Sequence, residues 1–557
     1  MPSWTPGSYL IRDYAGQVER LEARAPDGTN LPVTKVAKNR WRIDTGNADE
    51  AVVAYDVWAG SLSVQDSWVE SDFALLNGAS LYLYSEESRN LPQHLEVVRP
   101  ADWARVYVAL PGPDSQGPYR AQDFDELVDS PLLAGNAAEY RFEAGGAEFA
   151  LVNYGETEQW DSDKAAEDLF RIAQAHLDFW DVNPFDRRYL FVNILLSGKS
   201  GLEHDHSTVI MGSPSLMRRR EDYVDWLALA SHELFHAWNV RRMRPRALSE
   251  YNYDEEVYTR ELWLAEGLTS YYDNLLLFRA AVVTVQELFD LLATEMQQFE
   301  LQPGRLVTSA ELASFDSWVR HYKPTANLIN SNSSYYRMGS LIGFVIDTAI
   351  RQDTNGRRSL DDAMREMYAR YGSLGEEVGG YPAGALRDIV TALASKETGA
   401  LLHTLLTTAT DPDIDGALDW YGLTLVRAPD RQAAEDAGKP VPVDFGVTWR
   451  PDTPLLVVEH VLHGSTAAEA GILPNDELLA IDARRTTREN HLALINALKP
   501  GEVVTLTLSR HQRLITREVA VQHAIPAKYL ITTKPSVSRR EEGRLENWLG
   551  RPLQIAR

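Results

Sequence analysis

The most informative stretch of this 557-residue chain is Ser231-His232-Glu233-Leu234-Phe235-His236. Histidines at positions i and i+4 lie on one face of a helix, so the imidazoles of His232 and His236 can reach the same zinc ion. Glu233 stands between them, where its carboxylate can take a proton from a water molecule at the open position of that ion. The preceding residues carry an apolar stripe at helical spacing, which predicts that the motif lies on a helix. The alternative is a buried helix whose two histidines serve only packing.

A second run completes the ligand set, and it reads Trp263-Leu264-Ala265-Glu266-Gly267. Two histidines and one carboxylate form a three-ligand catalytic zinc site, so we expect His232, His236 and Glu266 to bind the metal and Glu233 to act as the base. Asp273 lies one heptad after Glu266 on the same helix face, where it can accept the outer N–H of a zinc-bound imidazole. The alternative for Asp273 is an exposed helix carboxylate. Because the chain contains no cysteine, histidine and carboxylate are the available ligands.

These motifs resemble the gluzincin metallopeptidases, the group of thermolysin and aminopeptidase N. The interval between His236 and Glu266 is longer than in those two proteins and is similar to that of the glycyl aminopeptidase family (peptidase family M sixty-one). The same family is indicated by three further runs, His236-Ala237-Trp238-Asn239-Val240-Arg241-Arg242-Met243-Arg244-Pro245, Gly201-Leu202-Glu203-His204 and Pro2-Ser3-Trp4-Thr5-Pro6-Gly7-Ser8-Tyr9. In relatives the last run lies some tens of residues further in. The resemblance therefore implies that the first strands of the N-terminal domain are missing here.

The resemblance implies two more site residues. Glu203 matches the glutamate of aminopeptidase N that pairs with the free α-amino group of the substrate. Tyr336 matches the tyrosine of a Tyr-Glu-Lys-Gly element, whose phenol donates a hydrogen bond to the tetrahedral oxyanion. Arg337 and Met338 depart from that element. Without the resemblance, Glu203 would be interpreted as a turn carboxylate and the tyrosine pair as core packing.

The composition excludes several classes of protein. Hydrophobic residues make up 44% and charged residues 24%, as in ordinary globular chains. Lys and Arg number 55 against 80 Asp and Glu, and the net charge of −25 argues against nucleic-acid or anionic-membrane binding. The first fifteen residues lack the charged and apolar regions of a signal peptide. We therefore expect a cytoplasmic location, with the periplasm open if a leader is missing.

The pattern along the chain predicts a multidomain α+β fold. Residues 1–160 alternate in short runs between turn residues, which is typical of a β-sandwich-like domain, and residues 161–411 predict a thermolysin-like, mainly helical catalytic domain. Residues 418–526 resemble a PDZ domain of the bacterial protease type. Its groove helix is expected at residues 491–498, and its carboxylate-binding entry at Phe445-Gly446 or Tyr421-Gly422. Residues 527–557 end in a stretch rich in Arg and Glu, which predicts a solvated C-terminal tail.

Together these features predict a zinc-dependent aminopeptidase with one Zn²⁺ per chain. The resemblance implies that small N-terminal residues, Gly and Ala foremost, are removed from peptide substrates. The PDZ groove is expected to take a peptide C-terminus or a segment of the chain itself. Two alternatives remain open, an endopeptidase of the same gluzincin chemistry and a PDZ scaffold with a vestigial zinc site.

Overall fold

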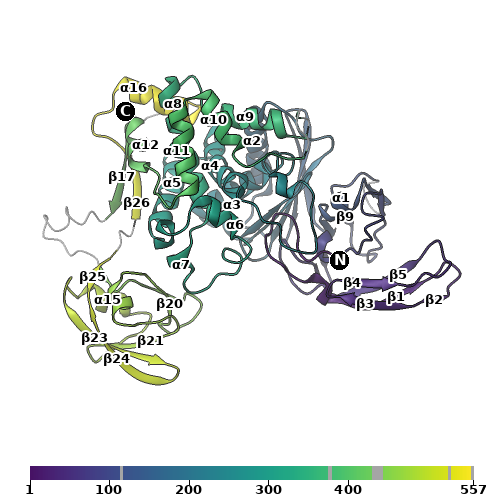
Figure 1. Ribbon diagram of the computed structural model, residues 1–557, viewed down its shortest axis with the longest axis horizontal. Helices are drawn as coiled ribbons and strands as arrows, with labels where there is room; N and C mark the ends of the chain where they lie inside the picture. Colours follow the sequence, from purple (N-terminus) through teal and green to yellow (C-terminus); the bar gives the residue numbers. More distant parts are fainter. Residues whose placement is uncertain (113–116, 374, 376–378, 429–442, 525–527, 553–557) are drawn as a thin grey trace. The chain divides into compact units, whose positions relative to one another are not determined.

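The computed structural model describes residues 1–112, 117–373, 375, 379–428, 443–524 and 528–552 (Figure 1). The chain divides into two compact units. The first unit contains residues 1–259, 272–283 and 361–389, and the second contains residues 260–271, 284–360 and 390–557. Within the described ranges, none of the helices combines the length and the apolar character needed to span a bilayer.

The first unit begins with small antiparallel sheets. One sheet has the strand order β2-β1-β5 and another has the order β6-β7-β11-β9. The turn residues between the short runs explain why these strands end early. The strands of this region are β1 (Val18–Arg24), β2 (Asn30–Leu31), β3 (Val33–Ala37), β4 (Arg40–Ile43), β5 (Val52–Val57), β6 (Trp68–Val69), β7 (Phe73–Leu76), β8 (Gln93–Leu95), β9 (Arg105–Tyr107), β10 (Tyr119–Ala121) and β11 (Leu132–Gly135), with the short helix α1 (Phe124–Val128) before the last.

A five-stranded sheet of the first unit positions one candidate site residue. Its order is β12-β13-β14-β16-β15, with the bounds β12 (Ala138–Ala144), β13 (Ala147–Tyr154), β14 (Tyr189–Leu195), β15 (Ser200–Glu203) and β16 (Ser207–Gly212). Every residue of β14 is buried, and β14 pairs in parallel with both neighbours, as an apolar run covered on both faces should. A third strand, β15, lies between β14 and β16 in the sequence and pairs antiparallel with β16. Glu203 is the last residue of this edge strand.

Helices of the first unit carry the histidine motif. Helix α2 (Ser162–Trp180) starts where Asp161 accepts a hydrogen bond from the Lys164 amide, and α3 (Arg220–Phe235) contacts it. His236 is the C-cap residue of α3, so the motif lies on the last turn of a helix, as predicted. Most residues of three further helices also belong to this unit: α4 (Thr269–Arg279), α9 (Leu360–Tyr371) and α10 (Ala385–Leu393).

The second unit is mainly helical before its C-terminal strands. It contains a π-helical segment labelled η5 (Trp263–Leu268), which contacts the long helix α8 (Tyr335–Thr354). Helix α5 (Val285–Glu300) begins at a capping box formed by Thr284 and Glu287. The other helices before the C-terminal strands are α6 (Ala310–Phe315), α7 (Leu328–Ser331), α11 (Lys396–Thr407) and α12 (Ile414–Trp420).

A separate apolar core organises the strands from residue 443 onward. Val458, Leu478 and Leu506 lie in it, each 1–2% exposed. Figure 1 shows β23 and β24 as a long antiparallel hairpin. The elements are β18 (Val443–Asp444), β19 (Val447–Trp449), β20 (Val458–Val461), α14 (Thr466–Glu469), β21 (Glu477–Ile481), β22 (Arg484–Arg485), α15 (His491–Asn496), β23 (Val503–Arg510), β24 (Arg513–Ala520) and β25 (Gln522–His523). The predicted groove helix is therefore α15, whereas the predicted end of the domain, after residue 526, lies outside the described residues.

The end of the chain corrects the prediction of a solvated tail. Strand β26 (Lys528–Thr533) pairs with β17 (Leu423–Ala428), and α16 (Arg539–Leu549) follows. Trp548 is 1% exposed, stacks on Tyr421 and donates to the Tyr271 hydroxyl at 2.8 Å. The charged residues of α16 that suggested a tail occupy its exposed face, while an apolar stripe of few residues anchors the helix.

Candidate active site

The histidines at the end of α3 both have Nε2 available as a metal-binding atom. The Nδ1 atom of His232 lies 2.9 Å from Asp273 Oδ2, and Nδ1 of His236 lies 2.8 Å from the backbone oxygen of Asn239. Because both partners are acceptors, each neutral ring carries its proton on Nδ1, which directs the lone pair of Nε2 outward. The ring centroids are 4.7 Å apart and the rings are nearly perpendicular, at 85°.

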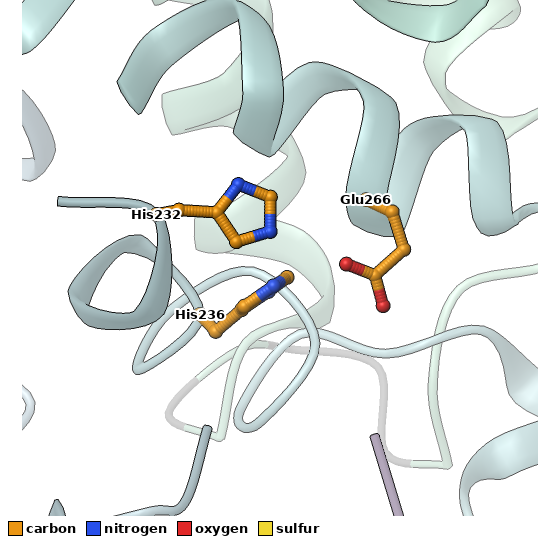
Figure 2. Close-up of side chains that lie close together, drawn as sticks. All are labelled: His232, His236 and Glu266. Carbon is orange, nitrogen blue, oxygen red and sulfur yellow. The ribbon is translucent and has the colours of Figure 1, made fainter. Parts of the chain in front are cut away.

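Glu266 adds a carboxylate to these rings. Figure 2 shows its side chain directed toward His232 and His236, and one potential ligand atom from each residue lies within 4.8 Å of the others. Glu266 belongs to the π-helical segment η5 and is 2% exposed. A π-helical turn widens the backbone locally and is frequent at functional sites. Two imidazole nitrogens and one carboxylate oxygen are a donor set that fits zinc.

Two glycines let η5 and α8 approach closely. A Cβ atom on Gly267 would lie 2.5 Å from the Cα atom of Gly339, and one on Gly339 would lie 2.2 Å from the carbonyl oxygen of Trp263. A side chain at either position would therefore push the two elements apart. The contact fixes the first turn of α8, which carries Tyr336, relative to the turn that carries Glu266.

Tyr336 is the tyrosine of the pair that faces Glu266. Its side chain is partly exposed, whereas Tyr335 is 0% exposed. Burial and then the nearby Glu266 carboxylate hold the pKa of Tyr336 well above its usual range, so the phenol keeps its proton and can act as a hydrogen-bond donor. This arrangement favours Tyr336 over Tyr335 for the role that the sequence suggested.

His321 is a neighbour that the sequence analysis did not identify. Its ring centroid lies 5.0 Å from that of Tyr335 and 5.6 Å from that of Tyr336. Burial lowers the pKa of His321 to about 4, although the Glu266 carboxylate acts in the opposite direction. The residue is therefore neutral near pH 7. No local pattern around His321 indicates its place, since it stands alone between helices.

Two carboxylates lie beside His236. Glu203 and Glu233 are each 4% exposed, and one oxygen from each lies within 4.8 Å of the other and of a His236 ring nitrogen. Strand β15 can approach α3 here because residue 201 is glycine, since a Cβ atom on Gly201 would lie 2.1 Å from Glu233 Oε1. Two buried carboxylates at this separation repel each other, so the position favours a bound cation.

Ionic contacts fix the turn that follows Glu203. The Arg241 guanidinium, 4% exposed, lies 2.7 Å from Asp205 and 2.9 Å from Asp129. Asp129 also lies 2.9 Å from Nδ1 of His204 and accepts a hydrogen bond from the Asp205 amide at 2.8 Å. Arg241 belongs to the loop after α3, so this network joins the end of β15 to the end of the histidine helix.

Asp273 lies in a buried chain of hydrogen bonds. It is 7% exposed, and burial raises the pKa of its carboxyl although the bond from His232 acts in the opposite direction. The Ser231 hydroxyl donates to the Asp273 backbone oxygen at 3.0 Å and lies 2.9 Å from Nε2 of His176. Because the single hydroxyl proton is used on Asp273, the His176 ring is the donor in the second bond. Asp273 is therefore a buried partner of His232 rather than an exposed helix carboxylate.

Comparison with known proteins gives three family-model matches. The family model of the M61 glycyl aminopeptidase matches residues 225–342, the model of the peptidase M61 N-terminal domain matches residues 1–136, and a PDZ domain model matches residues 443–521. A search of curated proteins finds no match.

Solved structures that are similar to this chain include the following two. An aminopeptidase N family protein from Idiomarina loihiensis is 27% identical with a TM-score of 0.91, and the alignment covers 99% of this chain and 94% of that one. An M1 zinc metallopeptidase from Deinococcus radiodurans is 13% identical with a TM-score of 0.44, over 71% of this chain and 85% of that one. The family-model matches and the Idiomarina loihiensis structure confirm the resemblance to the glycyl aminopeptidase family and the multidomain α+β fold with a C-terminal PDZ domain. They assign this chain as a peptidase.

Proposed function

We propose that this peptidase is a zinc-dependent aminopeptidase with one Zn²⁺ per chain, and that it removes small N-terminal residues, Gly and Ala foremost, from peptides. The observation that carries the proposal is the meeting of two groups at His236. In one group, His232, His236 and Glu266 form a donor set that fits a metal ion. In the other group, Glu233 and Glu203 lie close to His236, where Glu233 can act as a base and Glu203 can bind a cation. The preference for small residues rests on the family resemblance alone.

The residues around the histidines support zinc binding. Asp273 and the backbone oxygen of Asn239 hold both rings in the tautomer that leaves Nε2 as the ligand atom. Bound zinc would act as a Lewis acid toward the scissile carbonyl and would make water a better nucleophile. The remaining chemistry belongs to side chains of this chain.

In this proposal Glu233 is the general base. It is next in sequence to His232 on α3, is 4% exposed, and lies against Gly201. In this role its carboxylate takes the proton of the attacking water and then gives it to the leaving amine. Tyr336 keeps its phenolic proton, so it can donate a hydrogen bond to the oxyanion of the tetrahedral intermediate.

Glu203 supports an exopeptidase over an endopeptidase. A free α-amine is cationic near neutral pH, and its charge would offset the repulsion between the Glu203 and Glu233 carboxylates. An amide nitrogen within a peptide carries no such charge. The substrate is therefore expected to begin at Glu203, which places its first peptide bond at the base and the metal ligands.

Hydrolysis of aminoacyl anilides by the full chain, with and without a chelator, tests this function. We expect Glu233→Gln to keep zinc while kcat falls by at least ~100-fold, and Glu266→Ala to lower the zinc content itself. Glu221→Gln, an exposed glutamate in the first turn of α3, is the matched control and should behave as wild type. Full activity of zinc-loaded Glu233→Gln would exclude the proposed base.

The acetylated anilides separate the alternatives. Wild type should cleave alanine anilide and leave its N-acetylated form intact. Internal cleavage of acetylated peptides at a comparable rate would instead identify an endopeptidase. Protein that is purified without chelator and carries no zinc would support a scaffold with a vestigial site.

For the domains, we propose an N-terminal β-rich domain at residues 1–160, a catalytic domain at residues 161–411 and a peptide-binding PDZ domain within residues 418–526. The groove between β19 and α15 would take a peptide C-terminus. Of the two predicted entries to this groove, Phe445-Gly446 lies in the PDZ core region, with φ +76 at Gly446 and its oxygen accepting from the Leu462 amide at 2.9 Å. Tyr421 packs instead on Trp548 of α16.

A further inference from the structure

A tight turn near the start of the chain lies against Glu203. The Ser8 amide donates to the Thr5 oxygen at 3.1 Å, which closes a four-residue turn with Pro6 and Gly7 at its centre. Gly7 has φ +85, the value that the third position of a type II turn requires, and proline favours the second position. The sequence Pro-Gly therefore specifies this turn.

Neighbouring contacts hold the turn rigidly in the first unit. Trp4 is 0% exposed and donates from Nε1 to the Asn252 oxygen at 2.7 Å. The Ser3 amide donates to the Tyr253 oxygen at 2.7 Å, and Tyr9 is 2% exposed. A segment with this much buried aromatic surface cannot shift without loss of packing.

The backbone of Gly7 touches the Glu203 carboxylate. A Cβ atom on Gly7 would lie 2.5 Å from Glu203 Oε2, 2.6 Å from Oε1 and 2.7 Å from Cδ1 of Leu202. Both carboxylate oxygens would have to move, because these separations are far below van der Waals contact. Residue 7 therefore needs glycine for two separate reasons, the positive φ and the missing side chain.

The space around this contact is nearly filled. A cavity of about 10 Å³ is lined by the turn, by Glu203, and by Val240 and Tyr251 from the loop after α3. That volume holds at most one water molecule. Val240 has φ 102, a conformation that a β-branched residue rarely adopts, so the loop is held in a strained form where it meets the turn. Glu203 thus lies close to this packed turn and also close to His236 and Glu233.

We infer that Gly7 is a positioning residue for Glu203, and that the Thr5–Ser8 turn fixes where the amino terminus of a substrate binds. This inference rests on the proposed function, because it assigns a task to the carboxylate that would hold the amine. The turn limits the movement of the Glu203 carboxylate. It keeps the Glu203 carboxylate within reach of the amine and prevents it from rotating away from Glu233.

The expected effect of Gly7→Ala follows from the distances. Ordinary contact needs about 3.4 Å or more, so the carboxylate must shift by about 1 Å from its place. A misplacement of that size can cost about 100-fold in rate. We expect kcat/KM for alanine anilide to fall by ~10- to 100-fold, chiefly through KM, with the zinc content unchanged.

Gly28→Ala is the matched control. Gly28 has φ +86, and a Cβ atom there would meet nothing within 4 Å. The substitution introduces the same backbone strain as Gly7→Ala without a contact, so it should leave kcat/KM within ~2-fold of wild type. An equal loss of activity in both variants would show that strain, and not Glu203, is responsible, and would overturn the inference.

A double-mutant cycle isolates the contact. In the Glu203→Ala background the carboxylate is gone, so Gly7→Ala should change kcat/KM by less than ~3-fold. Its decrease in Tm should also be smaller there than in the wild-type background. The same fold-loss in both backgrounds would overturn the inference. If Gly7→Ala alone does not fold, folding of the double variant supports the contact, and failure of both to fold contradicts it. Inactive wild type on free-amine anilides would refute the proposed function instead.

Discussion

Removal of the Asp273 carboxylate should weaken metal binding without removing a ligand. Its Oδ2 atom accepts from Nδ1 of His232 at 2.9 Å, and both groups are nearly buried, with side chains 10% and 12% exposed. In Asp273→Ala the ring loses the partner that selects its tautomer and its orientation, and little water can replace it. Asp273→Asn keeps an amide oxygen as a neutral acceptor, which is weaker than an ionised one.

The size of the effect follows from this hydrogen bond. Loss of the partner of a metal-bound histidine typically costs 10- to 100-fold in metal affinity, or about 1.4 to 2.8 kcal/mol. We expect Asp273→Ala to fall in that range and Asp273→Asn to lose less than ~10-fold. The zinc dissociation constant is measured by competition with a chelator of known affinity. Asp290→Asn, in a surface pair with Gln286 on α5, is the control and should bind zinc as wild type does.

Three outcomes would refute the reasoning. A dissociation constant for Asp273→Ala within ~3-fold of wild type would show that the carboxylate does not support the ligand. Loss of activity with zinc binding unchanged would give Asp273 a role other than orienting His232. A larger effect of Asn than of Ala would also contradict it, because the amide retains an acceptor.

Two more predictions follow from buried contacts. Gly201→Ala would place a Cβ atom 2.1 Å from Glu233 Oε1, so kcat for alanine anilide should fall by ~100-fold or more while zinc stays bound. Gly16→Ala is the control, because a Cβ atom there would meet nothing within 4 Å, and it should leave kcat unchanged. Burial lowers the pKa of His176 to about 3, below its unfolded value of about 6.5, so the unfolded state binds more protons and the free energy of unfolding falls as pH drops below 6.5. Between pH 4 and 7.5, the Tm of the zinc-free protein should therefore depend less on pH in His176→Asn than in the wild type. Equal slopes of Tm against pH in the two proteins would exclude His176 as the cause.

Metal-ligand spacing was readable from the sequence because it depends on local helix geometry. His232 and His236 are one helical turn apart, which brings their rings together wherever the helix lies. Glu266 required a second helix, and its neighbour Gly267 marks the contact that the helix makes with α8. The prediction for Asp273 assumes a regular helix from Glu266 onward. The segment η5, which contains Glu266, is π-helical, and the Asp273 side chain still contacts His232. Its role stays a prediction.

Other features depend on contacts between distant segments, which local patterns do not encode. His321 lies in a turn between helices, where its ring is near that of Tyr336 in α8, and nothing around it in the sequence indicates this. In the last helix the charged residues outnumber the apolar ones, which predicts a tail, yet Trp548 is 1% exposed and stacks on Tyr421. Composition describes the exposed face of such a helix, and a few buried aromatic side chains decide whether it packs.

A glycine lies beside each of the three carboxylates of the candidate site. Glu203 lies against Gly7, Glu233 lies against Gly201, and Glu266 precedes Gly267, which touches Gly339. Each contact is made by backbone atoms, which cannot rotate away as a side chain can. The Glu203 and Glu233 carboxylates repel each other and need rigid neighbours, because flexible neighbours would let them separate and lose the geometry that a cation requires. The glycines are thus part of how this chain positions charge, and their substitution should disturb activity more than stability.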